Sequence, residues 1–300
     1  MTGRDETNLQ YKENTKKLLS EMPDFAERFY YSMTNMQESS KFTYMDNLKS
    51  FFDYIQYHFA IADLGEMFFR SISRTDLEKY IEFIESDYIK KGKKGQSAIA
   101  LKVFAIKKFF QYLYDEDKIE KNPAEKLKYK NESTENEPTF LTQDEIKELF
   151  ENIEKKGNQF INRDKLLFLI PMVTGMRVSP LHELNIEDID CDNKSIVVTE
   201  KENYKRIFKL DDNTFEVLFN WIREREYLLL YSREQINALF ITRTDKKYNR
   251  ITPMGIHEIY RKYTKDFDKN ITPHMMRRTF ANMAYKYTDH DIYAVSAMLG

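Results

Sequence analysis

Two residues that could hold a phosphate group stand near the end of this 300-residue chain. His274 and Arg277 are three positions apart, so on a helix both side chains project from one face. The pair Thr272-Pro273 predicts that a helix begins here, and a helix N-terminus carries the positive end of a dipole. The pattern therefore indicates a seat for a phosphate oxyanion. An exposed first turn with ordinary polar residues is the alternative.

Arg177 lies at a corner between two predicted helices, in the run Thr174-Gly175-Met176-Arg177-Val178-Ser179. Its neighbours are mostly apolar, so we expect the side chain to be partly buried. A partly buried arginine needs an anionic partner. Glu183, Asp188 or a substrate phosphate could supply it, and either carboxylate would make an internal salt bridge instead of a binding site.

Lys201 lies in a polar turn between two β-type runs, which predicts the tip of a hairpin. A lysine in such a turn is usually solvated. The functional alternative is an ammonium that reaches into a groove and donates a proton, because lysine lowers its pKa readily beside other cations.

The composition removes several classes of protein. The chain has one cysteine, Cys191, and five histidines without an HExxH pair, and it contains neither GxGxxG nor GxxxxGK[ST]. We therefore predict no disulfide framework, no metal, no cofactor and no nucleotide site. A polar N-terminus and the absence of a long apolar run indicate a soluble protein of a reducing compartment, without membrane association.

Charge is distributed unevenly although the net charge is only −2. Residues 88–130 hold twelve lysines against five acids (12 − 5 = +7), and residues 201–278 hold seventeen basic against eleven acidic residues (17 − 11 = +6). Such blocks can form a positive groove for nucleic acid. Ordinary solvated faces are the alternative.

Helices dominate the predicted elements. Apolar spacing predicts them over residues 11–33 with a break at Pro23, and over 44–59, 76–88 and 97–114. After a polar stretch at 128–138, Thr142 and Glu145 form a capping box, and further helices are expected at 165–174, 178–184, 254–265 and 273–287. The runs 195–199 and 206–210 predict a hairpin, and 239–242 a further short strand.

Together these fragments resemble the tyrosine recombinase (phage integrase) family, and in particular its Xer-like members. The matching segments, in the family's order, are Asn122-Pro123-Ala124, Leu141-Thr142 with Glu145, the run TGMRVS at 174–179, the run HMMRRTFA at 274–281 and Met298-Leu299-Gly300. Each motif is short, and their common order makes the resemblance specific.

The resemblance implies a mainly α fold with a small antiparallel sheet. It divides the chain into an N-terminal helical extension (1–35), a SAM-like core-binding helical domain (36–130), a linker (131–140) and an α+β integrase-type catalytic domain (141–300). The two domains would clamp double-stranded DNA, with Lys93, Lys94, Lys102 and Arg278 as DNA contacts. The full-length protein is expected to be a homotetramer on two DNA sites, cytoplasmic and encoded by a bacterium, phage or mobile element.

The resemblance also implies residue roles. Arg177 and Arg277 would clamp the scissile phosphate, His274 would assist there, and Lys201 would protonate the leaving 5′ oxygen. In this family a tyrosine attacks and forms a 3′-phosphotyrosyl intermediate.

The chain departs from the family pattern in the two segments that carry Arg177 and Arg277 (174–179 and 274–281, here called the arginine boxes) and at its end. Pro180 replaces the acid expected after Arg177, so support could come from Glu183, and Arg278 replaces a histidine. No tyrosine stands where the nucleophile is expected, which would lie beyond Gly300. We expect the chain as given to be a shortened recombinase, inactive in cleavage and a monomer or weak oligomer.

Two other functions remain open. A non-catalytic DNA-binding accessory or regulatory protein would use the same clamp without chemistry. A helical interaction protein unrelated to DNA is the third possibility, and strongly salt-dependent binding to duplex DNA would distinguish it from the others.

Overall fold

The computed structural model describes residues 3–91, 95–129, 140–199, 205–230, 232 and 235–299. Its contacts divide the chain into two compact units. The N-terminal unit is Asp5–Glu135, and the C-terminal unit is Asn136–Gly300 together with Met1–Arg4. Each unit has its own hydrophobic core, so each is described by itself.

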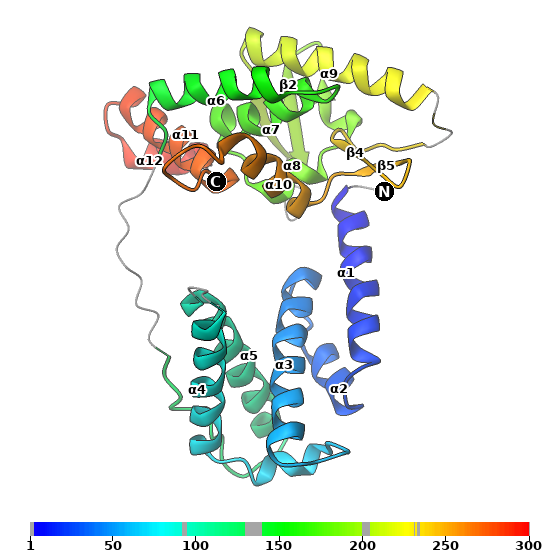
Figure 1. Cartoon of the computed structure of the whole chain (residues 1–300), viewed down its shortest axis with the longest axis vertical. Coiled ribbons are helices and arrows are strands. Elements are labelled where there is room, and N and C mark those ends of the chain that lie inside the picture. Colours follow the sequence, from blue (N-terminus) through cyan, green and yellow to red (C-terminus); the bar gives the residue numbers. More distant parts are fainter. Residues whose placement is uncertain are drawn as a thin grey trace. The chain divides into compact units, whose positions relative to one another are not determined.

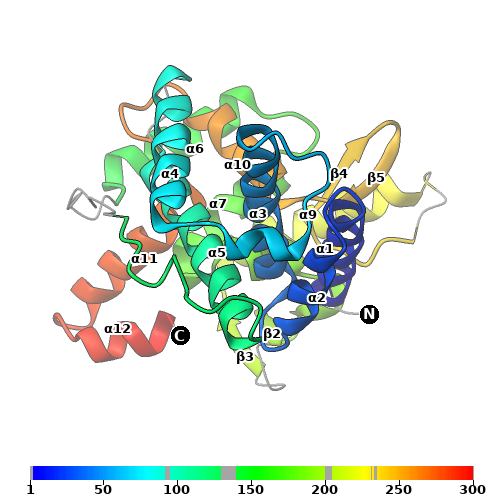
Figure 2. The same cartoon turned by 90° about the horizontal axis from the view of Figure 1, so that it is seen from below.

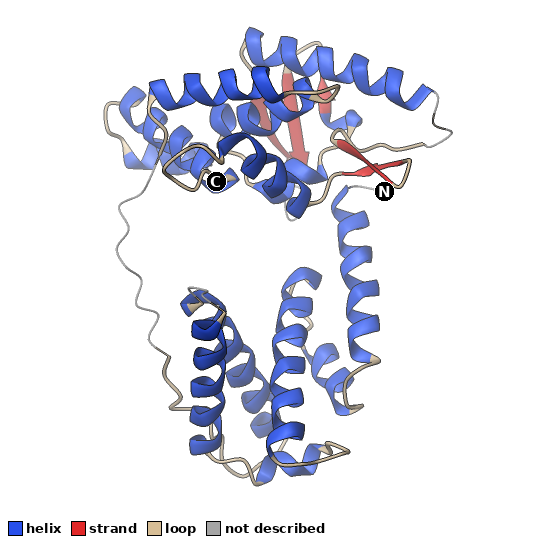
Figure 3. Ribbon diagram, in the orientation of Figure 1, coloured by secondary structure: helices blue, strands red, loops and turns tan. Residues whose placement is uncertain are grey.

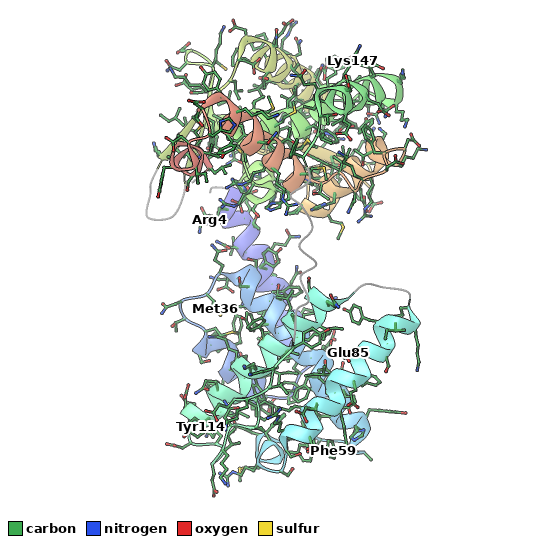
Figure 4. All side chains as sticks on the ribbon, turned by 90° about the vertical axis from the view of Figure 1, so that its left-hand side faces the viewer. Arg4, Met36, Phe59, Glu85, Tyr114 and Lys147 are labelled. Atoms are coloured by element: carbon green, nitrogen blue, oxygen red, sulfur yellow. The ribbon has the colours of Figure 1, made fainter. Side chains whose placement is uncertain are left out.

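Helices build the N-terminal unit (Figures 1 and 3). They are α1 (Gly3–Leu19), α2 (Phe25–Ser32), α3 (Glu38–His58), the short 3₁₀ helix η1 (Glu66–Arg70), α4 (Arg74–Lys90) and α5 (Gln96–Asp115). Figure 4 labels Phe59 at the end of α3, Glu85 on α4 and Tyr114 near the end of α5. The four predicted helical stretches are confirmed, and the break at Pro23 separates α1 from α2.

Aromatic side chains fill the core of this unit. Phe25, Phe52, Phe69 and Phe109 are all buried, and the rings of Phe69 and Phe109 meet edge to face with centroids 5.0 Å apart. Such edge-to-face pairs contribute beyond the apolar area that they bury. Because Phe25 on α2 belongs to this core, α2 is part of the N-terminal unit. Helix α2 therefore packs in one core with α3 and α5, and the division at residue 35 stays a prediction.

The C-terminal unit combines helices with two small antiparallel sheets (Figures 2 and 3). Its elements are α6 (Gln143–Lys156), α7 (Ile161–Thr174), α8 (Val178–Glu183), η2 (Ile186–Asp188), β1 (Ile189–Asp190), β2 (Ser195–Thr199), β3 (Lys205–Lys209), α9 (Asp212–Leu230), β4 (Ile241–Thr244), β5 (Lys247–Arg250), α10 (Pro253–Thr264), α11 (Pro273–Tyr287) and α12 (Ile292–Leu299). Strands β1, β2 and β3 form one sheet in that order, and β4 pairs with β5. The fold is therefore mainly α with small antiparallel sheets, as predicted.

Helix α7 runs through the core of the C-terminal unit and packs against α9 and α11. Leu166, Leu167, Phe168 and Ile170 on α7 are fully buried. Because Leu166, Leu167 and Phe168 are consecutive and therefore lie on different faces, α7 is buried on most of its sides, as expected for a central helix. This helix ends at the corner that holds Arg177, and its packing fixes where that corner lies.

Capping chemistry sets several helix starts. The predicted box is present at α6: the Thr142 amide donates to Glu145 Oε2 at 2.7 Å, and the Glu145 amide donates to Thr142 Oγ1 at 3.3 Å. Among the described residues, no helix has the length and apolar character needed to cross a bilayer. The predicted linker lies outside the described residues except for its last residue, Phe140.

Candidate active site

The start of α11 presents His274 and Arg277 as the sequence predicted. Thr272 is the N-cap, its side chain accepts the Met275 amide, and Pro273 occupies the first turn. His274 is exposed and Arg277 is half-buried. A capped first turn with a fixed proline holds both side chains in defined directions.

The corner between α7 and α8 presents Arg177. Gly175 ends α7 with a left-handed backbone (φ 68°), and its amide donates to the Pro171 carbonyl. Arg177 then caps the N-terminus of α8 with extended backbone angles. Its side chain is exposed, so the expectation of partial burial was wrong. The apolar character of the corner belongs to its neighbour Met176, which is 2% exposed and points into the core.

These two stretches, far apart in the sequence, meet through Arg277. Its Nη1 donates to the Gly175 carbonyl at 2.5 Å, and Gly175 is two residues before Arg177. Its Nη2 donates to the Leu299 carbonyl at 3.2 Å, at the end of α12. Backbone carbonyls orient the planar guanidinium without neutralising its charge, which is the property that an anion-binding arginine needs.

The pKa of His274 is affected by arginines from both arginine boxes. Its pKa is lowered from the ordinary 6.5, first by burial and then by the positive charges of Arg278, Arg277 and Arg177. Three guanidinium groups therefore lie close enough to act on one imidazole. Their convergence creates a strongly positive site, and a lowered pKa favours the neutral imidazole at pH 7, which can both donate and accept a hydrogen bond.

The two carboxylates considered as partners of Arg177 face another cation. Burial raises the pKa of Glu183 and of Asp188, and the Arg250 guanidinium lowers both. Arg250, at the end of β5, also donates to the carbonyls of His182 and Leu184, each at 3.0 Å. Arg250 thus ties β5 to the segment after α8.

The outcome differs among the other predicted residues. Lys93, Lys94 and Lys201 lie outside the described residues. Arg278 is exposed on α11. Lys102 on α5 is half-buried and lines a hollow of about 310 Å³ in the N-terminal unit together with Ser50 and Tyr88. Burial lowers the pKa of the Lys102 ammonium, and Asp46 acts in the opposite direction.

Sequence reasoning missed Arg206 on β3. Its guanidinium donates to the Leu299 carbonyl at 2.7 Å, the carbonyl that Arg277 also contacts. The alternation of RIFKL places Arg206 and Phe208 on one face of the strand, but nothing local to the strand indicates α12 as the partner. No group of three or more His, Cys, Asp or Glu side chains in the described part of the chain could hold a metal ion.

Gly175→Ala is expected to destabilise the C-terminal unit by about 1–3 kcal/mol, because the left-handed backbone disfavours a Cβ. That Cβ would also lie 2.7 Å from Phe280 Cδ1 and 2.9 Å from Leu299 Cδ2. Urea unfolding followed by tryptophan fluorescence measures the change, since the single tryptophan, Trp221, is fully buried in this unit. Gly255→Ala, in helix α10, is the matched control and should have a small effect; equal losses in both variants would contradict the argument.

Comparison with known proteins identifies the family. The phage integrase family matches residues 139–300. The tyrosine recombinase XerC of Thermodesulfovibrio yellowstonii is 31% identical over 231 residues, which are 70% of this chain and 74% of that protein. The XerC of Caldanaerobacter subterraneus subsp. tengcongensis is 27% identical over 244 residues, which are 80% of this chain and 65% of that protein. The chain belongs to the phage integrase family, among relatives that are tyrosine recombinases.

Solved structures share the fold. The XerH site-specific recombinase bound to difH substrate, in a pre-cleavage complex, matches with a TM-score of 0.62 at 23% identity. The match covers 91% of this chain and 76% of the XerH chain. The Tn1549 transposon integrase in complex with circular intermediate DNA has a TM-score of 0.60 at 18% identity, covering 91% and 90%. At these identities the likeness concerns the fold.

Proposed function

We propose that this chain is a site-specific tyrosine recombinase that acts on double-stranded DNA. The observation that carries the proposal is the bond from Arg277 to the Gly175 carbonyl, two residues before Arg177. That bond links the segment that carries Arg277 to the segment that carries Arg177, and it supports a site at which two guanidinium groups stabilise the negative charge of one phosphate.

The chemistry follows from charge. Attack on the scissile phosphorus spreads negative charge over the non-bridging oxygens, and Arg177 and Arg277 stabilise it. His274 hydrogen-bonds at the same phosphate. A tyrosine hydroxyl gives its proton to His274 as its oxygen forms the new bond to phosphorus, the bond to the 5′ oxygen breaks, and Lys201 supplies a proton to that oxygen. Because the phosphodiester energy is kept in the 3′-phosphotyrosyl bond, the strand can be rejoined without another energy source.

The N-terminal unit would contribute phosphate contacts, with Lys102 among them, together with Lys93 and Lys94. Lys102 is half-buried and lines the hollow described above, so its ammonium is partly desolvated. A partly desolvated cation gains more from an approaching phosphate than a fully hydrated one.

Assembly of four subunits on two DNA sites is part of the proposal. A cavity of about 520 Å³ lies between α11 and α12 and supports it. Ala281, Tyr285, Ile292 and Val295 line the cavity, with Arg277 and Arg278 at its edge. An open apolar cavity suits a docked segment of a neighbouring subunit, and its edge would place that contact beside the phosphate site.

A suicide-substrate assay tests the proposal. A duplex with a nick next to the scissile phosphate traps the covalent intermediate, and the protein is made in two forms, one that ends at Gly300 and one continued past it. We expect a covalent protein–DNA adduct whose linkage is to a tyrosine and requires Arg177 and Arg277. Duplex binding without an adduct in either form would instead favour the accessory DNA-binding protein.

Binding to duplex DNA should weaken steeply with salt. If six phosphates are contacted, the affinity should fall by about 10³-fold between 50 and 200 mM salt. Lys102→Gln should reduce the slope of log K against log salt by about one. Lys155→Gln is the control, since this α6 lysine pairs with Glu151 at 3.5 Å. A slope near zero for the unchanged chain would exclude the clamp.

A further inference from the structure

Arg206 lies on the half-buried face of strand β3. It pairs in register with Val198 of β2, and Arg206 and Phe208 alternate with the exposed Lys205, Ile207 and Lys209. The guanidinium lies over the Phe208 ring, 4.8 Å from its centroid. This stacking directs the arginine away from solvent and along the face of the hairpin.

The guanidinium reaches the end of another element. Its Nη1 donates to the Leu299 carbonyl at 2.7 Å, and its Nη2 donates to the Met298 carbonyl. Both residues belong to α12, and each carbonyl oxygen has lone pairs that can accept from a donor outside the helix. Arg206 therefore attaches the hairpin to the end of α12 by two bonds from one planar group.

One of these carbonyls is shared with the candidate active site. The Leu299 carbonyl also accepts from Arg277 Nη2 at 3.2 Å, while Arg277 Nη1 is bonded to Gly175. A carbonyl oxygen has two lone pairs and can accept from both arginines. The position of Leu299 thus limits where the Arg277 guanidinium can lie, and Arg206 limits the position of Leu299.

We propose that Arg206 is a positioning residue: it holds the end of α12 so that the Leu299 carbonyl orients Arg277 for the phosphate. Arg206 acts through Leu299, not on the substrate itself. The functional meaning rests on the proposed recombinase function, whereas the structural coupling between Arg206, α12 and Arg277 does not.

Hydrogen exchange on the 300-residue chain without DNA tests the coupling. Arg206→Gln should raise amide exchange in residues 292–299 by about tenfold, because a charge-assisted bond that restrains the last turn is lost. Exchange in α7 should stay unchanged. Arg206→Lys, which keeps the charge and a donor, should restore part of the protection. Lys205→Gln, one residue away and exposed, should behave like the unchanged chain.

A second measurement follows Arg277 directly. Its Nε–H signal in a ¹⁵N-edited spectrum is assigned by its loss in Arg277→Lys, and it should shift or broaden in Arg206→Gln but not in Lys205→Gln. Unchanged exchange in α12 with an unchanged Arg277 signal would overturn the proposal. So would faster exchange throughout the C-terminal unit with a lower unfolding midpoint of Trp221 fluorescence, since that indicates general destabilisation. If the chain without substitutions does not bind duplex DNA, the recombinase function is refuted, whereas the structural coupling between Arg206, α12 and Arg277 is not affected.

Discussion

Arg277→Ala is expected to slow DNA strand cleavage by about 10²–10³-fold while duplex affinity changes little, because the loss of one preorganised donor to a transition-state oxyanion costs that much. Affinity for duplex comes from many phosphate contacts, so the loss of one should be small there. The guanidinium is fixed by the Gly175 and Leu299 carbonyls and needs no rearrangement to receive charge.

The measurement is single-turnover adduct formation on a suicide duplex, using the chain continued past Gly300, beside a gel-shift titration. Arg277→Lys should recover only a small part of the rate, since an ammonium cannot reproduce the planar fork. Arg261→Ala, an exposed arginine of α10, is the control for loss of one positive charge. Losses of equal size in cleavage and in duplex affinity would show that Arg277 only binds DNA.

Asp164→Ala should destabilise the C-terminal unit by about 3–5 kcal/mol, because it leaves a buried guanidinium without its carboxylate. Arg163 and Asp164 are both buried, and Arg163 Nη2 lies 2.6 Å from Asp164 Oδ1. The Tyr263 hydroxyl donates to Asp164 Oδ2 at 2.7 Å, and Arg163 Nη1 donates to the Ile241 carbonyl at 2.9 Å. The carboxylate therefore joins α7 to α10, and through Arg163 to β4.

Urea unfolding followed at Trp221 measures this loss in the C-terminal unit. Glu148→Ala, an exposed acid on α6, removes the same charge and should change the unfolding free energy by less than about 0.5 kcal/mol. A similar small change for Asp164→Ala would mean that the cluster relaxes or takes in water. Tyr263→Phe should cost less than Asp164→Ala, because it removes the hydroxyl that donates to Asp164 and accepts from Lys262 but leaves the buried ion pair intact.

Local chemistry allowed most helix starts to be predicted. Thr142 with Glu145, and Thr272 before Pro273, satisfy amides within their own turn, so neighbouring residues suffice to identify them. Helix α9 was missed although its start carries a similar signal: the Thr214 amide donates to Asp211 Oδ1 at 3.0 Å. The start of α9 is indicated in the sequence by Asp211, a residue type that favours the N-cap, three residues before Thr214.

The core contacts of α2 and the solvent exposure of Arg177 depend on tertiary structure and could not be predicted from neighbouring residues. The break at Pro23 could be predicted from the residue type, but the core that Phe25 and Phe29 of α2 share with α3, η1 and α5 could not, because it joins residues far apart in the sequence. Arg177 looked half-buried because its sequence neighbours are apolar, yet a left-handed Gly175 turns its side chain outward. Solvent exposure at a corner depends on backbone geometry, which neighbouring residue types do not specify.

Some residues of the candidate site could be predicted from the sequence and others could not. Resemblance to a family predicted Arg177, His274 and Arg277 as site residues, and in the structure Arg277 is bonded to the Gly175 carbonyl while both arginines act on His274. Arg206 could not be found in that way. Its partners are carbonyls 92 and 93 residues further along the chain, and a carbonyl is present at every residue, so no residue type marks the contact.

The anchoring of Arg277 by main-chain oxygens affects how this protein would respond to random mutagenesis. A substitution can remove a side-chain acceptor, whereas a main-chain carbonyl is present whatever the residue type and moves only when the local backbone conformation changes. Loss-of-function alleles around the anchor should therefore gather at Gly175, where the trace is most constrained, rather than scatter over the surrounding shell.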